Sequence, residues 1–580
     1  MRRKKIVMSF NRRSVLLTSS AGVGLLSLGA IGLWAKSGTG VSVAPLARDE
    51  SFPSLPIGMN LAGIADWEPG FPFKNLFLGA RPWLTRNLSG KGPHDTKAQE
   101  AFSFDEDGYP LEVPVAAPGA EEPQAVFTYV PNVRSAGRYV LLYDGEGEIE
   151  GLASTKVISR KPGRILLQMA HGSGGAYEAV VIKRSKRGNH IRNIRLVTES
   201  QENDNLRDEP FLPELVDFCR SFHCLRFMDW GATNNSLQER WSDRKKPSFY
   251  TMVASTGDPQ GTWGPPPSSF NYRFAGGVAY EYMIQLCNAV KSDMWLCIPH
   301  RATDDYILQL AKLVKQNLDP GLKVYVEYSN EIWNWQFHQA GWMLRSPLAG
   351  ALVEAKGGSP WKDDAKTEGK DHPERIGALF RRAFAIWEQE WAGAADRLIR
   401  VCAVQAAWAD ASIRTLRWCL EHGGVDAVSP AAYFGPDKAI YKKWDTLGEQ
   451  LTPDDVIDDM GSVIGALRTG GGLLEIVAFA KQHGLAYFAY EGGQHIQPEG
   501  QKELPYAPAI AQAQVDSRMY DLYVELLRVH RDLECQMFGH FSSIGKQGTR
   551  YGSWGAKASY SMPDQDSPKM RALIACNAKR

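Results

Sequence analysis

Apolar runs of strand length recur along the chain, and segments with helical periodicity separate most of them. The runs centre on residues 57, 225, 296, 326, 401, 428, 488 and 538. Alternating strand and helix patterns predict an α/β fold with a parallel sheet. Because eight parallel strands close a barrel, we predict a (β/α)8 TIM barrel. Its first strand is expected within residues 50–96, followed there by an irregular segment rich in Pro, Gly and Trp.

Residues 97–200 follow a different pattern. Six short β-type runs lie at 125–130, 139–143, 156–159, 164–169, 177–183 and 191–197, with turn residues such as Asp144-Gly145-Glu146-Gly147 between them. Strands at this spacing predict a small, sandwich-like all-β domain. We therefore expect an insert between the first barrel strand and the remainder of the barrel, at 201–575. Carbohydrate binding and a purely structural role are both open for this insert.

Residues 1–36 are predicted to be an export signal or a membrane anchor. A basic head, with Arg12-Arg13, precedes an uncharged stretch from Ser14 to Ala35 that is rich in Gly, Ser and Leu. The stretch resembles a twin-arginine export signal, which implies a periplasmic or extracellular protein. Ser42-Val43-Ala44 is a candidate cleavage site, and an uncleaved membrane anchor is the alternative.

Composition narrows the classes of function. The chain has 580 residues, a net charge of +1 and 44% hydrophobic residues, so nothing in it favours nucleic-acid binding. Its eight cysteines include no CxxC pair, which predicts buried free thiols and no zinc site. No nucleotide or redox motif is visible. We expect a monomer that needs neither a metal nor a cofactor.

Polar and aromatic residues lie where the predicted barrel strands end. The fourth strand, around residue 326, runs into Ser329-Asn330-Glu331, and these residues alone could equally cap the next helix. Asn60 and Asp66 lie at or after the end of the first strand. The second, third, fifth, sixth, seventh and eighth strands carry, in that order, Arg226, His300, Gln405, Tyr433, Glu491 and His540. Trp554 lies in the loop after the eighth strand. A barrel gathers all these ends at one face, so we predict a single site there.

The ends of the fourth and seventh strands resemble those of clan A glycoside hydrolases of the family 5 type. The likeness rests on Ser329-Asn330-Glu331 and, 160 residues later, Tyr490-Glu491-Gly492; it covers residues 55–67 and 211–560. It implies a retaining hydrolase of β-linked glycans such as cellulose, β-glucan, mannan or xylan. By that resemblance Glu331 is the acid/base and Glu491 the nucleophile. The chemistry needs one protonated and one ionised carboxyl, about 5 Å apart for retention.

The resemblance implies roles for further residues. Asn330 would bond the sugar 2-hydroxyl, and Arg226 and Tyr433 would bond the nucleophile. His300 and His540 would lie on the substrate side, and Trp554 would be the aromatic floor under the cleaved sugar. A structural role is the alternative for Arg226, Tyr433, Trp554 and His540. Independently of the resemblance, strand alternation points Glu327 into the barrel, as a structural or tuning acid.

Two other functions remain at this stage. A barrel of this kind can bind a polysaccharide without cleaving it, because fold does not fix function. The presence of both carboxylates, with Arg226 and Tyr433 in support, argues against that alternative. A metal-dependent hydrolase is the third, and the sequence lacks the His-rich ligand set it would need.

Overall fold

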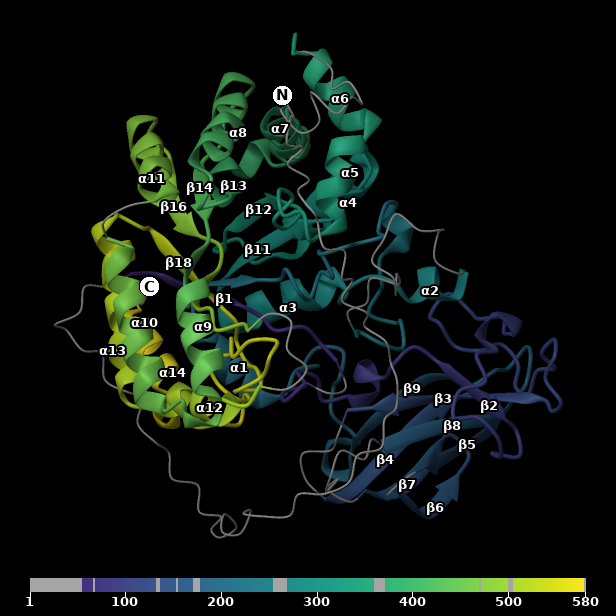
Figure 1. The fold of residues 1–580 in the computed structure, drawn as a ribbon. Coiled ribbons are helices and arrows are strands. Elements are labelled where there is room, and N and C mark those ends of the chain that lie inside the picture. Colours follow the sequence, from purple (N-terminus) through teal and green to yellow (C-terminus); the bar gives the residue numbers. More distant parts are fainter. Residues whose placement is uncertain are drawn as a thin grey trace, which may run out of the picture.

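A closed barrel of eight parallel strands forms one part of the computed structural model (Figure 1). The structure describes residues 55–65, 68–131, 136–152, 155–169, 178–253, 269–358, 371–468, 471–498 and 504–577. The barrel strands, in order around the ring, are β1 (Ile57–Asn60), β10 (Cys224–Arg226), β11 (Asp293–Ile298), β12 (Val324–Tyr328), β13 (Leu398–Val404), β14 (Ala427–Pro430), β16 (Ala486–Ala489) and β18 (Met537–Phe541). Pairing of β18 with β1 closes the ring. The predicted barrel and its eight strands are confirmed.

Most of the helices surround the barrel, and α2 (Ser269–Phe274) lies apart from it (Figure 1). The others are α1 (Pro213–Cys219), α3 (Tyr280–Val290), α4 (Asp304–Asn317), α5 (His338–Arg345), α6 (Pro347–Glu354), α7 (His372–Glu390), α8 (Ala409–Glu421), α9 (Lys438–Leu447), α10 (Pro453–Ala466), α11 (Gly472–Gln482), α12 (Ala507–Val515), α13 (Arg518–Asp532) and α14 (Pro568–Cys576). Strands enclosed between this layer and the barrel interior are apolar on both faces, which explains the continuous hydrophobic runs in the sequence. A short parallel pair, β15 (Ala432–Phe434) with β17 (Gly492–Gln494), extends beyond β14 and β16.

Local sequence signals set where several helices begin. The Thr303 hydroxyl accepts a hydrogen bond from the Tyr306 amide and caps α4. Thr452 and Asp455 form a reciprocal capping box at α10, which begins with a proline. Such caps satisfy backbone N–H groups that have no partner within the helix.

Two antiparallel four-stranded sheets form a separate layer structure, at the lower right of Figure 1. One sheet has the order β2 (Leu84–Asn87), β3 (Gln124–Val130), β8 (Glu178–Ser185), β5 (Gly147–Leu152); the other has β6 (Lys156–Lys161), β7 (Arg164–Met169), β4 (Gly137–Asp144), β9 (Arg192–Thr198). Val130 and Val180 of the first sheet and Leu141 and Leu167 of the second line one small apolar space, so the sheets pack face to face. The predicted sandwich is therefore present.

The sequence missed two of the sandwich strands. Strand β2 lies within the segment expected to be irregular, so the sandwich begins before residue 97. Strand β5 has the sequence Gly-Glu-Ile-Glu-Gly-Leu, in which two glycines and two glutamates obscure the strand pattern. Both strands are held by pairing with β3 or β8. Their own composition does not favour a strand, so they depend on partners that sequence analysis does not place.

The insert leaves and rejoins the barrel at one point. Phe73 and Phe211 form an antiparallel bridge, and their rings stack with centroids 5.5 Å apart. The amide of Leu212 donates to the carbonyl of Pro72, and that of Lys74 donates to Pro210. The two ends of the insert are therefore held side by side.

All eight cysteines are free and buried, as the sequence predicted. Burial raises the pKa of thiols such as Cys219 and Cys287, which keeps them protonated and unreactive. In the part of the chain that the structure describes, no helix is both long enough and apolar enough to cross a membrane. The twin-arginine-like segment lies outside the described residues.

We expect the native protein to react slowly with a thiol reagent such as Ellman's, and eight thiols to react after unfolding in guanidinium chloride. Ser159→Cys, on the exposed face of β6, is the matched control and should add one fast-reacting thiol. A fast-reacting thiol in the unsubstituted native protein would contradict the buried assignment.

Candidate active site

The guanidinium of Arg226, at the end of β10, is the centre of a buried polar network. Its Nη1 donates to Glu491 Oε1 (2.6 Å) and Asn60 Oδ1 (2.9 Å). Its Nη2 donates to Asn330 Oδ1 (2.8 Å) and Glu327 Oε1 (3.0 Å), and its Nε donates to Glu327 Oε2 (3.0 Å). All five N–H groups of the guanidinium are thus used. The side chain is 2% exposed, so this network fixes its position.

Glu327 lies beneath the strand ends and is fully buried. Besides Arg226, it accepts hydrogen bonds from Trp295 Nε1 (2.8 Å) and Cys297 Sγ (3.4 Å). Burial raises the pKa of Glu327, while Arg226 and these donors oppose the rise. The inward orientation expected for Glu327 is confirmed, and its contacts make it the structural partner of Arg226.

Glu491 follows β16 and is 5% exposed. One carboxylate oxygen accepts from Arg226 (2.6 Å) and the other from the Tyr433 hydroxyl (2.8 Å). Burial raises its pKa to about 7, against the lowering effect of Arg226; the charge of Glu331 adds to the rise, and the Tyr433 hydrogen bond opposes it. The ionised form therefore has two directed donors, one of them cationic. The predicted contacts of Arg226 and Tyr433 with Glu491 are present.

Glu331, just beyond β12, has a different environment. It is half-buried, and its two oxygens accept from the Tyr490 hydroxyl (2.7 Å) and from Asn334 Nδ2 (2.7 Å). Neither the Tyr490 hydroxyl nor the Asn334 amide carries a charge. Glu331 is therefore held in place while keeping access to solvent.

The backbone around Asn330 is strained. Ser329 has φ of +64° and Glu331 has φ of +39°, in the left-handed region that side chains other than glycine rarely adopt. Asn330 lies between them and is buried; its Nδ2 donates to Asn234 Oδ1 (3.1 Å). Strain of this kind concentrates at functional sites, because the surrounding contacts must hold it. This observation favours a site over a simple helix cap.

Tyr490 and Tyr433 each donate a hydrogen bond to one of the two glutamates. Tyr490 precedes Glu491 in the chain, and its hydroxyl reaches Glu331. Burial raises the pKa of both phenols, and the charges of both glutamates raise it further. The phenols therefore stay protonated and donate. Glu331 and Glu491 are thus close enough to influence the same groups, at the carboxyl ends of the barrel strands.

Trp554 lies beside this pair, although it follows β18 by thirteen residues. Its ring contacts those of Tyr433 (5.6 Å between centroids), Phe541 (5.5 Å) and His495 (4.5 Å). Lys569 of α14 donates to the carbonyls on either side of Trp554, those of Ser553 (2.6 Å) and Gly555 (3.3 Å). The structure therefore places Trp554 beside Tyr433, which donates to Glu491. The expected role of Trp554 as an aromatic floor stays a prediction.

His300 and His540 are both buried in this structure, and their expected substrate contacts stay predictions. His540 is fully buried, with Nε2 against the Tyr523 hydroxyl (3.1 Å). His300 is 2% exposed and packs against Trp342 (5.4 Å between centroids). Burial lowers the pKa of both to about 3, so both are neutral. Asp66, expected near the first strand, lies outside the described residues.

Sequence analysis did not identify four residues that shape the site. Tyr490 and Asn334 hold Glu331, Asn234 holds Asn330, and His495 contacts Trp554. Tyr490 and Asn334 could have been found, because each lies within three residues of a predicted glutamate. Asn234 and His495 carry no such signal, since they lie in loops. Among the described residues, no group of three or more His, Cys, Asp or Glu side chains is placed to hold a metal ion.

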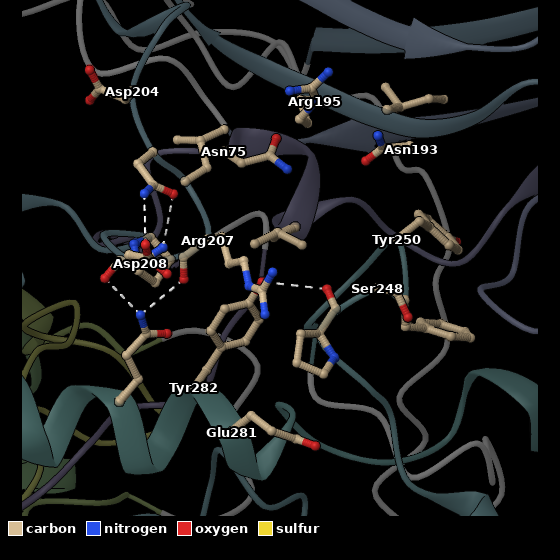
Figure 2. A pocket seen from close by; sticks show the side chains of 18 of the residues that line it. Asn75, Asn193, Arg195, Asp204, Arg207, Asp208, Ser248, Tyr250, Glu281 and Tyr282 are labelled. Atoms are coloured by element: carbon tan, nitrogen blue, oxygen red, sulfur yellow. Dashed lines mark hydrogen bonds between the residues drawn. The ribbon is translucent and has the colours of Figure 1, made fainter. Parts of the chain in front are cut away.

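A hollow of about 740 Å³ lies elsewhere, between the sandwich and the barrel (Figure 2). Neither Glu331 nor Glu491 lines it. Two of its acids are already paired: Asp204 lies 3.1 Å from Lys74, and Glu281 lies 3.0 Å from Arg244. The carboxylate pair is therefore identified by its hydrogen-bond network rather than by the size of a cavity.

No protein-family model and no curated protein sequence matches this chain. Among solved structures, it is similar to the GH51 arabinofuranosidase from Xanthomonas axonopodis pv. citri (13% identity, TM-score 0.35, 60% of this chain and 63% of that protein). It is also similar to a Cellulomonas fimi endo-beta-1,4-mannanase double mutant (11% identity, TM-score 0.28, 51% of this chain and 56% of that protein). A third similar structure is a Bacteroidetes-affiliated GH5 cellulase linked with a polysaccharide utilization locus (10% identity, TM-score 0.34, 63% of this chain and 83% of that protein). The chain spans less than two thirds of the first two proteins. Likeness at this level assigns no activity, so the chemistry rests on the side chains.

We expect Arg226→Met to lower the free energy of unfolding by about 3–5 kcal/mol, because it leaves Glu327 buried without its cation. Arg220→Met is the control: Arg220 is exposed and its ion pair with Asp217 (2.8 Å) lies at the surface, so a change within about 0.5 kcal/mol is expected. Urea unfolding followed by circular dichroism measures both. Equal losses in the two variants would contradict the assigned role of Arg226.

Proposed function

We propose that this protein is a retaining glycoside hydrolase that cleaves β-linked glycans of the cellulose, β-glucan, mannan or xylan type. One observation carries the proposal: two neighbouring carboxylates at the carboxyl end of the barrel are held by different sets of donors. Glu491 is buried against a cation and a phenol, and Glu331 is half-buried against a phenol and an amide. This division supports the roles that the sequence suggested.

The first step needs a nucleophile and an acid. A carboxylate oxygen of Glu491 attacks the anomeric carbon as the bond to the leaving oxygen breaks, and Glu331 gives its proton to that oxygen. Arg226 and Tyr433 orient Glu491 through fixed hydrogen bonds, so its attacking lone pair is held in one direction. The product is a glycosyl ester on Glu491 and a free alcohol.

The second step reverses the role of Glu331. Its carboxylate takes a proton from a water molecule, whose oxygen attacks the anomeric carbon and releases Glu491 as a carboxylate. The partial exposure of Glu331 supports this role, because both the leaving group and the water must reach it. Two inversions give net retention of configuration.

The segment resembling a twin-arginine signal supports the further proposal that the protein acts outside the cytoplasm. Free, buried thiols are compatible with that route, because twin-arginine cargo folds before export.

Release of reducing sugar from β-glucan, mannan and xylan tests the proposal. Glu491→Gln should abolish release, and Glu331→Gln should lower kcat by about 10²–10⁴, the usual contribution of general acid–base catalysis. Glu354→Gln, at an exposed position on α6, is the matched control and should keep full activity.

Azide or formate should restore turnover to Glu491→Gly, because a small anion can occupy the space of the lost carboxylate. Binding of the polysaccharides without hydrolysis by the unsubstituted protein would instead support the alternative of a non-catalytic glycan-binding barrel.

The pH dependence follows from Glu491. Its carboxyl is ionised above a pKa of about 7, so kcat/KM should fall about tenfold per pH unit below that value. Tyr433→Phe removes a hydrogen bond that lowers this pKa, so the acidic limb of the profile should move to higher pH. An acidic limb that does not move in Tyr433→Phe would contradict the predicted coupling.

A further inference from the structure

Two indoles are unusually exposed at the face of the barrel that carries Glu331. Trp335 is 55% exposed and Trp408 is 45% exposed. Trp335 lies in the loop after β12, and Trp408 lies in the loop after the neighbouring strand β13. Because both loops leave the carboxyl ends of parallel strands, both indoles lie at the catalytic face.

A third ring joins the two indoles. The centroid of His372, the first residue of α7, lies 5.7 Å from that of Trp335 and 5.1 Å from that of Trp408. His372 is buried while the indoles are exposed. Trp335, His372 and Trp408 therefore form one continuous group, here named the aromatic strip.

Core packing does not explain the aromatic strip. Indoles used for packing in this protein are fully enclosed, namely Trp83, Trp230, Trp295, Trp387, Trp391 and Trp444. A single exposed aromatic residue needs no explanation, but adjacent exposed apolar surface usually marks a contact site. The strip therefore suits a ligand with a flat apolar face.

The position of the strip relative to the carboxylates is defined by the chain. Trp335 follows Glu331 by four residues, and the intervening Asn334 donates to Glu331. Trp554 follows β18, which is directly opposite β12 in the ring, with three strands between them on each side. Aromatic groups thus lie at opposite sides of the barrel mouth, and the strip is on the side of the acid/base strand.

We propose that the aromatic strip binds the leaving-group side of a neutral glycan chain, stacking on pyranose rings beyond the bond that is cleaved. The C–H face of a pyranose offers the flat apolar surface that an indole covers, and its rim of hydroxyls stays in water. Sugar sites on both sides of the carboxylates make the proposed substrate a polysaccharide that is cleaved internally. This inference rests on the proposed function.

Two kinds of substrate distinguish the contribution of the aromatic strip from that of Glu331 and Glu491. An aryl β-cellobioside has no sugar on its leaving-group side, whereas soluble β-glucan, glucomannan and xylan do. Trp335→Ala, Trp408→Ala and the double variant should raise KM for the polysaccharide that is cleaved by about 10- to 100-fold. Their kcat/KM on the aryl glycoside should stay within about threefold. Ile158→Ala, at an exposed apolar residue on β6 of the sandwich, is the control and should change neither.

Equal losses of activity on both kinds of substrate, or no loss on the polysaccharide, would contradict the proposed role of the aromatic strip. Neither result would contradict the proposed function. If the unsubstituted protein cleaves neither substrate, the proposed function is wrong. Polysaccharide binding then tests the role of the aromatic strip separately. Affinity electrophoresis in the same three polysaccharides should then show retardation that the double variant loses. Retardation that persists in the double variant, or is absent from the unsubstituted protein, would overturn the strip.

Discussion

A single buried guanidinium organises the centre of this protein. Arg226 has a planar, rigid set of five N–H groups, and acceptors from β1, from β12 and the turn after it, and from the end of β16 meet all five. Because each acceptor lies at or just beyond the carboxyl end of its strand, the network fixes the relative positions of those ends. A guanidinium that left any of these groups unmatched would carry a desolvation penalty of several kcal/mol. Barrel closure and site geometry therefore depend on the same contacts.

The charges of this network explain the ionisation of Glu491. Arg226 lies between two buried carboxylates and carries one positive charge. Glu327 accepts two hydrogen bonds from Arg226. The positive charge of Arg226 therefore balances the negative charge of Glu491 only in part. Burial then raises the pKa of Glu491 to about 7, close to neutrality. Glu327 and Glu491 thus share the single positive charge of Arg226.

The barrel could be predicted because its strands are buried on both faces. Continuous apolar runs of strand length marked all eight, whereas β2 and β5 of the sandwich are polar or glycine-rich and depend on their partners. Glu331, Glu491, Arg226 and Tyr433 were found because polar groups at the ends of apolar strands are conspicuous. His300 and His540 have the same pattern, yet their rings are buried, because a residue's place in the chain does not fix whether its side chain faces solvent.

The aromatic strip could not be predicted from the sequence for a related reason. Seventeen tryptophans occur in the chain, and composition cannot separate Trp335 and Trp408, which are exposed in the described part of the chain, from the tryptophans of the core. Only the contacts of Trp335 and Trp408 with His372, which is distant from both in sequence, identify them as a group.

The bridge between Phe73 and Phe211 has a consequence for how the barrel is assembled. Strands β1 and β10 are neighbours in the ring, although the whole sandwich separates them in sequence. Closing a long flexible loop between them would be entropically unfavourable. Once the sandwich has folded and its two ends are paired at Phe73 and Phe211, the inserted segment connects β1 and β10 as a short hairpin turn would. The sandwich is therefore a module that could be exchanged for a short turn, with the barrel's strand register kept.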